Sequence, residues 1–254
     1  MIDLKDTTFI IPIMIDSKDR LINYNIVIDF LLKNFNTNII VCESDSESHE
    51  DLLKRDGIDY MFVKNEGLFH RTRLLNIMTK KVNTEIVVNY DIDVVFKNHQ
   101  YVECRDAIKS GEYDVCYPYN GNFFNIRKYY HSYVKENNLD DIDLDQCEIA
   151  NPNSLGGAFF FNKQKYVEAG LENENFVSWG FEDNERVDRL SKLGYKLSRI
   201  SGVLYHLEHE RTINSTPEQP NYIDNMNEYN KILEMSKDEL IKYIKTWDWI
   251  NDRF

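Results

Sequence analysis

The chain has 254 residues, 42% of them hydrophobic and 13% aromatic, which is enough for one large folded domain and unlike a disordered composition. Its formal net charge of −13 argues against nucleic acid and anionic membrane surfaces as partners. The same charge would repel a phosphate-bearing substrate. Such a substrate would therefore need a bound divalent cation or local basic side chains.

The chain shows no pattern of export or membrane insertion. Met1–Asp6 carries acids in place of the apolar run of a signal peptide, and polar residues interrupt every apolar segment before it reaches the length of a membrane span. The four cysteines are scattered, without the short paired spacings of a zinc knuckle or a disulfide scaffold. We therefore expect a cytoplasmic protein with no membrane span.

The first half of the chain alternates short apolar strands with amphipathic helices. We expect strands at 8–14, 38–42, 59–63 and 85–90, and helices from near Ser17, at 51–55 and at 70–80. This alternation predicts βαβ crossovers and a largely parallel sheet, whose ligand site lies beyond the carboxyl ends of the strands. No glycine-rich loop follows the first strand, which excludes a P-loop and a dinucleotide fingerprint.

The second half is less regular. We expect a helix over 122–137, an acidic loop over 140–145, a strand over 156–161, a helix over 182–193 and two short strands over 195–206. Ser236 and Glu239 have the spacing of a capping box and predict a further helix. We divide the chain into a catalytic domain, 1–212, and a helical C-terminal extension, 213–254, packed on it.

Two carboxylates, Asp91 and Asp93, directly follow the fourth predicted strand. At the carboxyl end of a strand, such a pair can hold a hard divalent cation and the diphosphate that the cation bridges. Asp141 and Asp143 have the same spacing without a strand before them, and we interpret them as a solvated acidic loop. The strand context therefore favours a functional role for Asp91 and Asp93.

The segment from Trp179 to Asp183 places a glycine between an aromatic residue and the paired acids Glu182 and Asp183. This pattern predicts a tight turn into a helix whose first turn carries the acids. Acids at that position also compensate the helix dipole. On this segment alone, dipole compensation is the favoured interpretation.

Two histidines, His206 and His209, follow a strand-like run. Imidazole is a common ligand of manganese and zinc, so these histidines and the strand-end carboxylates could form one mixed site for a divalent first-row metal. The alternative is a pair of surface histidines, and for His209 the two interpretations are equally favoured.

The order of these motifs resembles that of inverting GT-A glycosyltransferases of the β-1,4-galactosyltransferase type, over about residues 9–211. Chondroitin-polymerase domains and polypeptide N-acetylgalactosaminyltransferases are similar but more distant. The matching segments are Ile10–Ile13 with Arg20, Val41–Glu43, Phe69–Asn76, the DXD-type metal motif Tyr90–Asp93, Gly156–Gly157 and Trp179–Asp183.

The resemblance implies a GT-A fold, which is Rossmann-like with a mostly parallel central sheet flanked by helices. It also implies a metal-dependent inverting transferase that moves a hexose or N-acetylhexosamine from a UDP-sugar to a hydroxyl of a glycan or glycoconjugate. Asp93, His206 and, less firmly, His209 would bind Mn²⁺ or another divalent cation. Glu182 would help to hold the acceptor, and Asp183 would be the catalytic base. The donor would be contacted by Pro12, Ile13, Arg20, Glu43, Arg71, Asp91, Asp93, Gly156, Gly157 and Trp179.

The chain also departs from the family. The basic loop after the first strand is reduced to Lys18 and Arg20, and Ser154 stands where galactose-specific enzymes carry a bulky tyrosine, which leaves room for an N-acetyl group. The donor sugar therefore stays open.

Two other functions stay open as well. A nucleotidyltransferase or a metal-dependent phosphohydrolase would also use paired aspartates on a metal. A nucleotidyltransferase would normally carry a glycine- and arginine-rich loop after the first strand, which this chain lacks. A sugar-nucleotide-binding module without turnover is the third interpretation, and the presence of both Asp93 and Asp183 argues against it.

Overall fold

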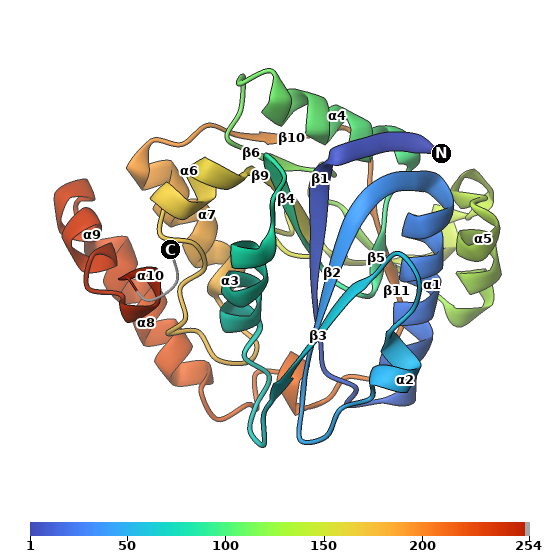
Figure 1. The fold of residues 1–254 in the computed structure, drawn as a ribbon, viewed down its shortest axis with the longest axis horizontal. Coiled ribbons are helices and arrows are strands. Elements are labelled where there is room, and N and C mark those ends of the chain that lie inside the picture. Colours follow the sequence, from blue (N-terminus) through green and yellow to red (C-terminus); the bar gives the residue numbers. More distant parts are fainter. Residues whose placement is uncertain (252–254) are drawn as a thin grey trace.

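A seven-stranded sheet runs through the centre of the molecule in the computed structural model, which describes residues 1–251 (Figure 1). Its strands follow the order β10-β6-β9-β4-β1-β2-β3. Their bounds are Ile2–Ile13 for β1, Phe35–Asp45 for β2, Asp59–Lys64 for β3, Ile86–Tyr90 for β4, Val115–Tyr117 for β6, Ala158–Asn162 for β9 and Leu197–Arg199 for β10.

Neighbouring strands of this sheet are parallel except around β9, which runs antiparallel to both β4 and β6. The central strands are apolar along their length because both faces are covered: Phe9, Ile10, Val87 and Val88 are fully buried. The prediction of a mostly parallel α/β sheet is therefore confirmed.

Helices flank the central sheet (Figure 1). Their bounds are Lys18–Asn34 for α1, Glu50–Leu53 for α2, Arg71–Lys81 for α3, Asn98–Lys109 for α4, His131–Glu136 for α5, Lys163–Glu168 for α6 and Glu182–Leu193 for α7. Sequence signals mark several of their ends. The Ser17 side chain accepts a hydrogen bond from the Arg20 backbone N–H at the start of α1, and Gly194, at φ 95°, ends α7 in the left-handed region.

A second, smaller sheet brings distant segments together in the order β5-β11-β7-β8. Its strands are Val94–Val95 (β5), Phe123–Ile126 (β7), Glu148–Asn151 (β8) and Leu204–Leu207 (β11). The antiparallel pairing of β11 with β5 places His206 opposite Val94, the residue after Asp93. The parallel pairing of β11 with β7 places His206 opposite Asn125.

The predicted helix over 122–137 is wrong in its first part. Residues Phe123–Ile126 form strand β7, and the α-helix there is limited to His131–Glu136. The reason is tertiary, because β7 is hydrogen-bonded between β11 and β8, partners that lie far away or were not recognised in the sequence. Aromatic residues fit well in a half-buried strand.

The C-terminal segment forms helices α8 (Tyr222–Glu234), α9 (Lys237–Ile244) and α10 (Asp248–Asn251). Helices α8 and α9 pack beside α7 (Figure 1), where the Tyr229 hydroxyl donates to Asp188 at 2.6 Å. The capping box of Ser236 and Glu239 is confirmed at the start of α9. The division at residue 212 stays a prediction.

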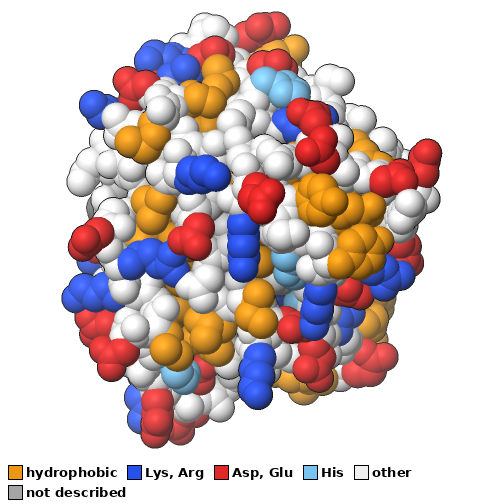
Figure 2. Space-filling model, turned by 90° about the vertical axis from the view of Figure 1, so that its right-hand side faces the viewer, with side chains coloured by type: hydrophobic (Ala, Val, Ile, Leu, Met, Phe, Trp, Pro, Cys, Tyr) orange, Lys and Arg blue, Asp and Glu red, His pale blue; other side chains and the backbone are white. Residues whose placement is uncertain are grey.

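Charged side chains cover much of the surface seen in Figure 2, as the 29% of charged residues in the sequence would suggest. On the side of α1 and α5, acidic and basic side chains are interspersed and hydrophobic side chains gather in small groups (Figure 2). Among the helices within residues 1–251, none has both the length and the apolar character needed to cross a bilayer.

Candidate active site

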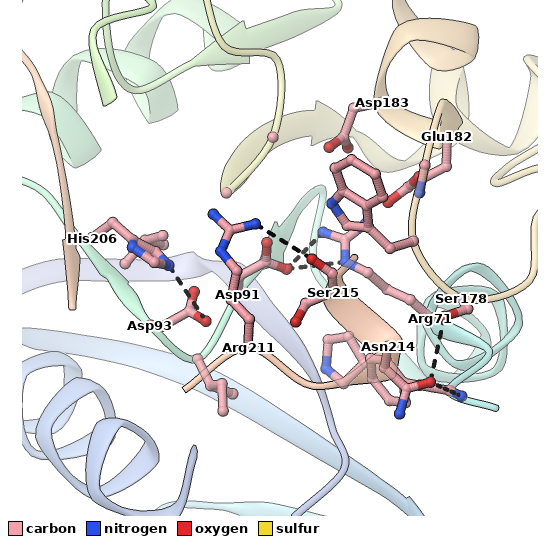
Figure 3. A pocket seen from close by; sticks show the side chains of 18 of the residues that line it. Arg71, Asp91, Asp93, Ser178, Glu182, Asp183, His206, Arg211, Asn214 and Ser215 are labelled. Atoms are coloured by element: carbon pink, nitrogen blue, oxygen red, sulfur yellow. Dashed lines mark hydrogen bonds and ion pairs between the residues drawn. The ribbon is translucent and has the colours of Figure 1, made fainter. Parts of the chain in front are cut away.

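A pocket of about 610 Å³ lies where β1 and β4 end and β11 passes beside them (Figure 3). This is the edge of a parallel sheet at which ligands bind. It is lined by thirteen of the fourteen predicted site residues: Pro12, Ile13, Arg20, Arg71, Asp91, Asp93, Gly156, Gly157, Trp179, Glu182, Asp183, His206 and His209. The motifs that the sequence spreads over almost 200 residues therefore meet in one cavity.

Glu43 is the predicted site residue that the structure does not bring to this pocket. Its carboxylate is fully buried and accepts hydrogen bonds from the His49 backbone N–H at 3.0 Å and from the Tyr60 hydroxyl. His49 Nδ1 lies 2.6 Å from the same carboxylate. Because these neighbours occupy both oxygens of Glu43, its placement does not support a donor contact.

Three side chains meet at one end of the pocket, which we call the cation end: Asp93, His206 and His209. Their ligand atoms all lie within 4.8 Å of one another. Asp93 Oδ2 is 3.2 Å from His209 Nε2 and 3.8 Å from His206 Nε2. One carboxylate oxygen and two imidazole nitrogens are a donor set that suits a first-row divalent metal.

Hydrogen bonds orient both imidazoles toward Asp93. His209 Nδ1 is 2.7 Å from the Glu210 carbonyl oxygen, which can only accept, so Nδ1 carries the proton. His206 Nδ1 is 2.8 Å from Asn125 Oδ1, its neighbour across the β11–β7 pairing. These Nδ1 contacts turn both rings so that Nε2 faces Asp93, as in metal-binding histidines held by an outer partner.

The charge of Asp93 is balanced within the pocket. Arg20, at the start of α1, forms an ion pair with Asp93 Oδ2. Burial alone would raise the pKa of Asp93, but His206, His209 and Arg20 hold it well below its usual range. Asp93 is therefore an anion at neutral pH, as a metal ligand must be.

Arg71 and Asp91 lie between the cation end and the acids of α7 (Figure 3). Arg71 Nε and Nη2 both donate to Asp91 Oδ1, at 3.0 and 2.7 Å. Arg71 Nη1 is buried and has no hydrogen-bond partner within the part of the chain that the structure describes. A buried guanidinium N–H without an acceptor is costly, so this group is suited to an anionic ligand.

The acids of α7 form the other end of the pocket, which we call the base end. In the turn that precedes α7, the residues Ser178, Gly180 and Phe181 have positive φ values of 60°, 119° and 70°. This turn brings Glu182 and Asp183 to the first turn of α7, facing the pocket. Burial, and then the Asp183 carboxylate, raise the pKa of Glu182 to about 7 against the opposing charge of Arg71.

Gly156 permits the close approach of Asp183. A Cβ at position 156 would lie 2.6 Å from Asp183 Oδ2, nearer than atoms can come without a shift. Gly157 has a φ of 87° and accepts a hydrogen bond from the Asp91 backbone N–H through its carbonyl oxygen at 2.9 Å. The glycine pair therefore links the two carboxylate motifs.

Several pocket residues were not predicted from the sequence: Arg211, Asn214, Ser215 and Tyr222. Tyr222, from α8, stacks on Trp179 with ring centroids 6.0 Å apart and planes 10° apart. No local signal marks these residues as functional. They reach the pocket because the segment after β11 returns to it.

Comparison with known proteins connects this site to galactosyltransferases. Residues 141–211 match a family described as the N-terminal domain of galactosyltransferase, and this segment supplies Gly156, Gly157, Trp179, Glu182, Asp183, His206 and His209. No curated protein sequence shows a significant match.

Solved structures extend the likeness beyond that segment. The catalytic domain of Drosophila β1,4-galactosyltransferase 7 in complex with xylobiose aligns with a TM-score of 0.53 and 15% identity, over 94% of this chain and 84% of that chain. The fold is that of a GT-A galactosyltransferase. A mutant of the same Drosophila enzyme, in complex with manganese, UDP-Gal and xylobiose, aligns with a TM-score of 0.49 and 14% identity, over 82% of this chain and 72% of that chain.

The GT-A fold and the family match together support a glycosyltransferase. The predicted fold class is confirmed at this level. The family match covers the pocket residues between positions 141 and 211. The structural likeness covers 94% of the chain and so also includes the central sheet, in which β4 leads into Asp91 and Asp93.

Proposed function

We propose that this protein is a metal-dependent inverting glycosyltransferase that transfers a hexose or N-acetylhexosamine from a UDP-sugar to a hydroxyl of a glycan or glycoconjugate. The observation that carries the proposal is the content of the pocket. A carboxylate–imidazole set suited to a divalent cation lies at one end, and a carboxylate at a helix N-terminus lies at the other.

Asp93, His206 and His209 would hold the cation, Mn²⁺ or a similar ion. Their fit is supported by the mixed O/N donor set and by the two Nδ1 hydrogen bonds that leave Nε2 available. When bound, such a cation supplies positive charge to a departing diphosphate. This also resolves the repulsion between a phosphate-bearing donor and a chain with a net charge of −13.

Side chains of the protein would bind the rest of the donor. Arg71 and Arg211 both line the pocket. Both are suited to phosphate oxygens. Pro12, Ile13 and Trp179 offer apolar and aromatic surface beside these charges, and Ser154 leaves space beside the glycine pair. Gly156 and Gly157 line the pocket beside them, where the donor would contact their backbone.

Asp183 would act as the general base. The acceptor hydroxyl oxygen attacks the anomeric carbon, its proton passes to Asp183, and the bond between that carbon and the diphosphate oxygen breaks to release UDP. A single displacement inverts the anomeric configuration. A positioned base contributes about 10²–10⁴-fold to the rate of such a step.

Glu182, Trp179 and Tyr222 would hold the acceptor. Trp179 is 37% exposed and its ring lies parallel to that of Tyr222, so these rings offer an aromatic surface of the kind on which sugars stack. The xylobiose bound to the Drosophila relative supports a carbohydrate acceptor.

The proposal is tested by measuring UDP release from UDP-galactose, UDP-glucose, UDP-N-acetylgalactosamine and UDP-N-acetylglucosamine, each with Mn²⁺ and with EDTA. We expect release from one donor, dependent on the metal, and a product of inverted anomeric configuration by NMR. Absence of release, together with absence of thermal stabilisation by UDP and Mn²⁺, would contradict the proposal. Release of phosphate from simple esters would favour a phosphohydrolase instead.

A further inference from the structure

The Asp183 carboxylate forms an ion pair with an arginine on its own helix. Arg186 Nη1 donates to Asp183 Oδ1 at 2.7 Å. The other carboxylate oxygen, Oδ2, points toward Gly156, which lines the pocket. The two oxygens therefore have different surroundings: Oδ1 is in a charge-assisted hydrogen bond, and Oδ2 faces the space where an acceptor would lie.

The position of Arg186 is fixed by contacts on every side of its guanidinium group. The side chain is fully buried, and its Nε and Nη2 donate to the two oxygens of Glu172 at 2.8 and 2.9 Å. Its guanidinium carbon lies 3.8 Å from the centroid of the Phe159 ring, a cation–π contact. One planar fork thus joins Glu172 to Asp183 at a set angle.

Glu172 is in turn anchored to the central sheet. Its Oε1 accepts hydrogen bonds from the Tyr166 hydroxyl at 2.8 Å and from Asn89 Nδ2 at 3.0 Å, and Asn89 belongs to β4. Burial alone would raise the pKa of Glu172, but Arg186 holds it below its usual range. The pair is therefore ionised, and a buried ion pair with this many hydrogen bonds resists rearrangement.

We propose that Arg186, anchored by Glu172, is a positioning residue that holds Asp183 with Oδ2 directed at the acceptor hydroxyl. This inference rests on the proposed function, in which Asp183 is the base. The chain of contacts from β4 through Glu172 and Arg186 fixes the orientation of the Asp183 carboxylate relative to the central sheet. A displacement of a reacting group by about 1 Å can cost about 10²-fold in rate, so the network matters for turnover more than for donor binding.

The matched variants are Arg186→Lys and Arg189→Lys. Arg189 lies one turn further along α7, is equally buried and pairs with the buried Glu185 at 2.6 Å, but it donates to the Leu171 carbonyl oxygen instead of to Asp183. A lysine keeps the charge and loses the fork. Both variants should therefore lose similar stability, and only Arg186→Lys should disturb the proposed base.

We expect kcat of Arg186→Lys to fall by about 10²-fold, with the KM for the donor changed by less than about threefold. Thermal stabilisation by UDP and Mn²⁺ should be retained. Arg189→Lys should keep kcat within about threefold of the wild type. Glu172→Gln, which retains a hydrogen-bonding side chain at the anchor, should lower kcat by about 10-fold at unchanged donor KM and decides the question if Arg186→Lys does not fold.

A wild-type kcat in a folded Arg186→Lys or, where that variant does not fold, in Glu172→Gln would overturn the positioning role. Equal losses of kcat in the two lysine variants, or loss of UDP binding in Arg186→Lys, would assign Arg186 a structural role and also overturn the proposal. Absence of turnover in the wild type with every donor is a different outcome, because it contradicts the proposed function itself.

Discussion

The two ends of the pocket hold their charges in different ways. At the cation end, Asp93 is paired with Arg20, whose side chain is 17% exposed, and with two imidazoles that bond to neutral oxygens through Nδ1. At the base end, Asp183 is paired with Arg186, which is fully buried and bound to a second buried carboxylate.

At the cation end a charged partner of the carboxylate can be replaced by a ligand, whereas at the base end the carboxylate and its partner are fixed in position. The partly exposed Arg20 can move aside when a cation arrives at Asp93, since water can solvate its guanidinium group. Arg186 has no such freedom, because moving it would leave Glu172 buried and unpaired. We infer that ligand binding is concentrated at the cation end and orientation at the base end. Each prediction below tests that separation.

The largest effect is expected from Asp93→Ala. The substitution removes the proposed metal ligand and the partner of Arg20, so metal-dependent turnover should fall by on the order of 10⁴-fold and UDP with Mn²⁺ should no longer raise the melting temperature. Asp141→Ala is the matched control, because Asp141 has the same Asp-x-Asp spacing and is exposed at the end of the short 3-10 helix Leu139–Asp141. If Asp93→Ala still bound UDP in a metal-dependent way, the cation end would have to be placed elsewhere.

Asp183→Asn should reduce kcat by on the order of 10³-fold, because the amide cannot accept the acceptor proton. Thermal stabilisation by UDP and Mn²⁺ should stay at the wild-type level, in contrast to Asp93→Ala. Asp188→Asn on the same helix, where Asp188 bonds to Tyr229 outside the pocket, controls for changes in α7. Equal turnover in Asp183→Asn and the wild type would remove Asp183 from the chemistry.

Gly156→Ala should lower kcat by about 10²-fold with little change in stability. The added Cβ would lie 2.6 Å from Asp183 Oδ2, and because Arg186 holds that carboxylate from the other side, the oxygen must leave its position. The metal dependence of UDP binding should be unchanged. Gly67→Ala is a suitable control, since its Cβ would lie 3.5 Å from the nearest atom. Wild-type kcat in Gly156→Ala would mean that Asp183 tolerates displacement.

Most of the pocket could be predicted because its residues lie at ends of elements that local patterns reveal. Asp91 and Asp93 follow an apolar strand, and Glu182 and Asp183 begin an amphipathic helix. The carboxyl ends of parallel strands meet at one edge, so strand order along the chain was sufficient to bring the first motif to the site. His206 and His209 follow a strand-like run and carry a common metal ligand, so they are candidates from the sequence itself.

The rest depends on contacts that local patterns do not encode. The pairing of β11 with β5 spans more than a hundred residues and alone places His206 beside Asp93. Glu43 has the expected residue type at a strand end, yet His49 and Tyr60 occupy its carboxylate. The link from Glu172 to Arg186 depends on how α7 packs over β9, which no periodicity shows. Long-range register and packing were the missing information.

The smallest predicted effect concerns the stability of the base end. The ordinary pKa of a glutamate is near 4.5, and in the folded protein burial and Asp183 raise that of Glu182 to about 7. Between these values the folded state binds the proton more tightly than the unfolded chain does, so the contribution of Glu182 to stability falls as the pH rises from about 4.5 to about 7.

Glu182→Gln removes this penalty while an amide oxygen can still accept the Gly180 backbone N–H, a bond of 2.9 Å in the wild type. At pH 8 the variant should be more stable than the wild type by on the order of 2 kcal/mol, and the gain should shrink by about half at pH 5.5. Chemical denaturation at the two pH values measures both, with exposed Glu234→Gln as the control. A gain of equal size at both pH values would mean that Glu182 carries no buried charge.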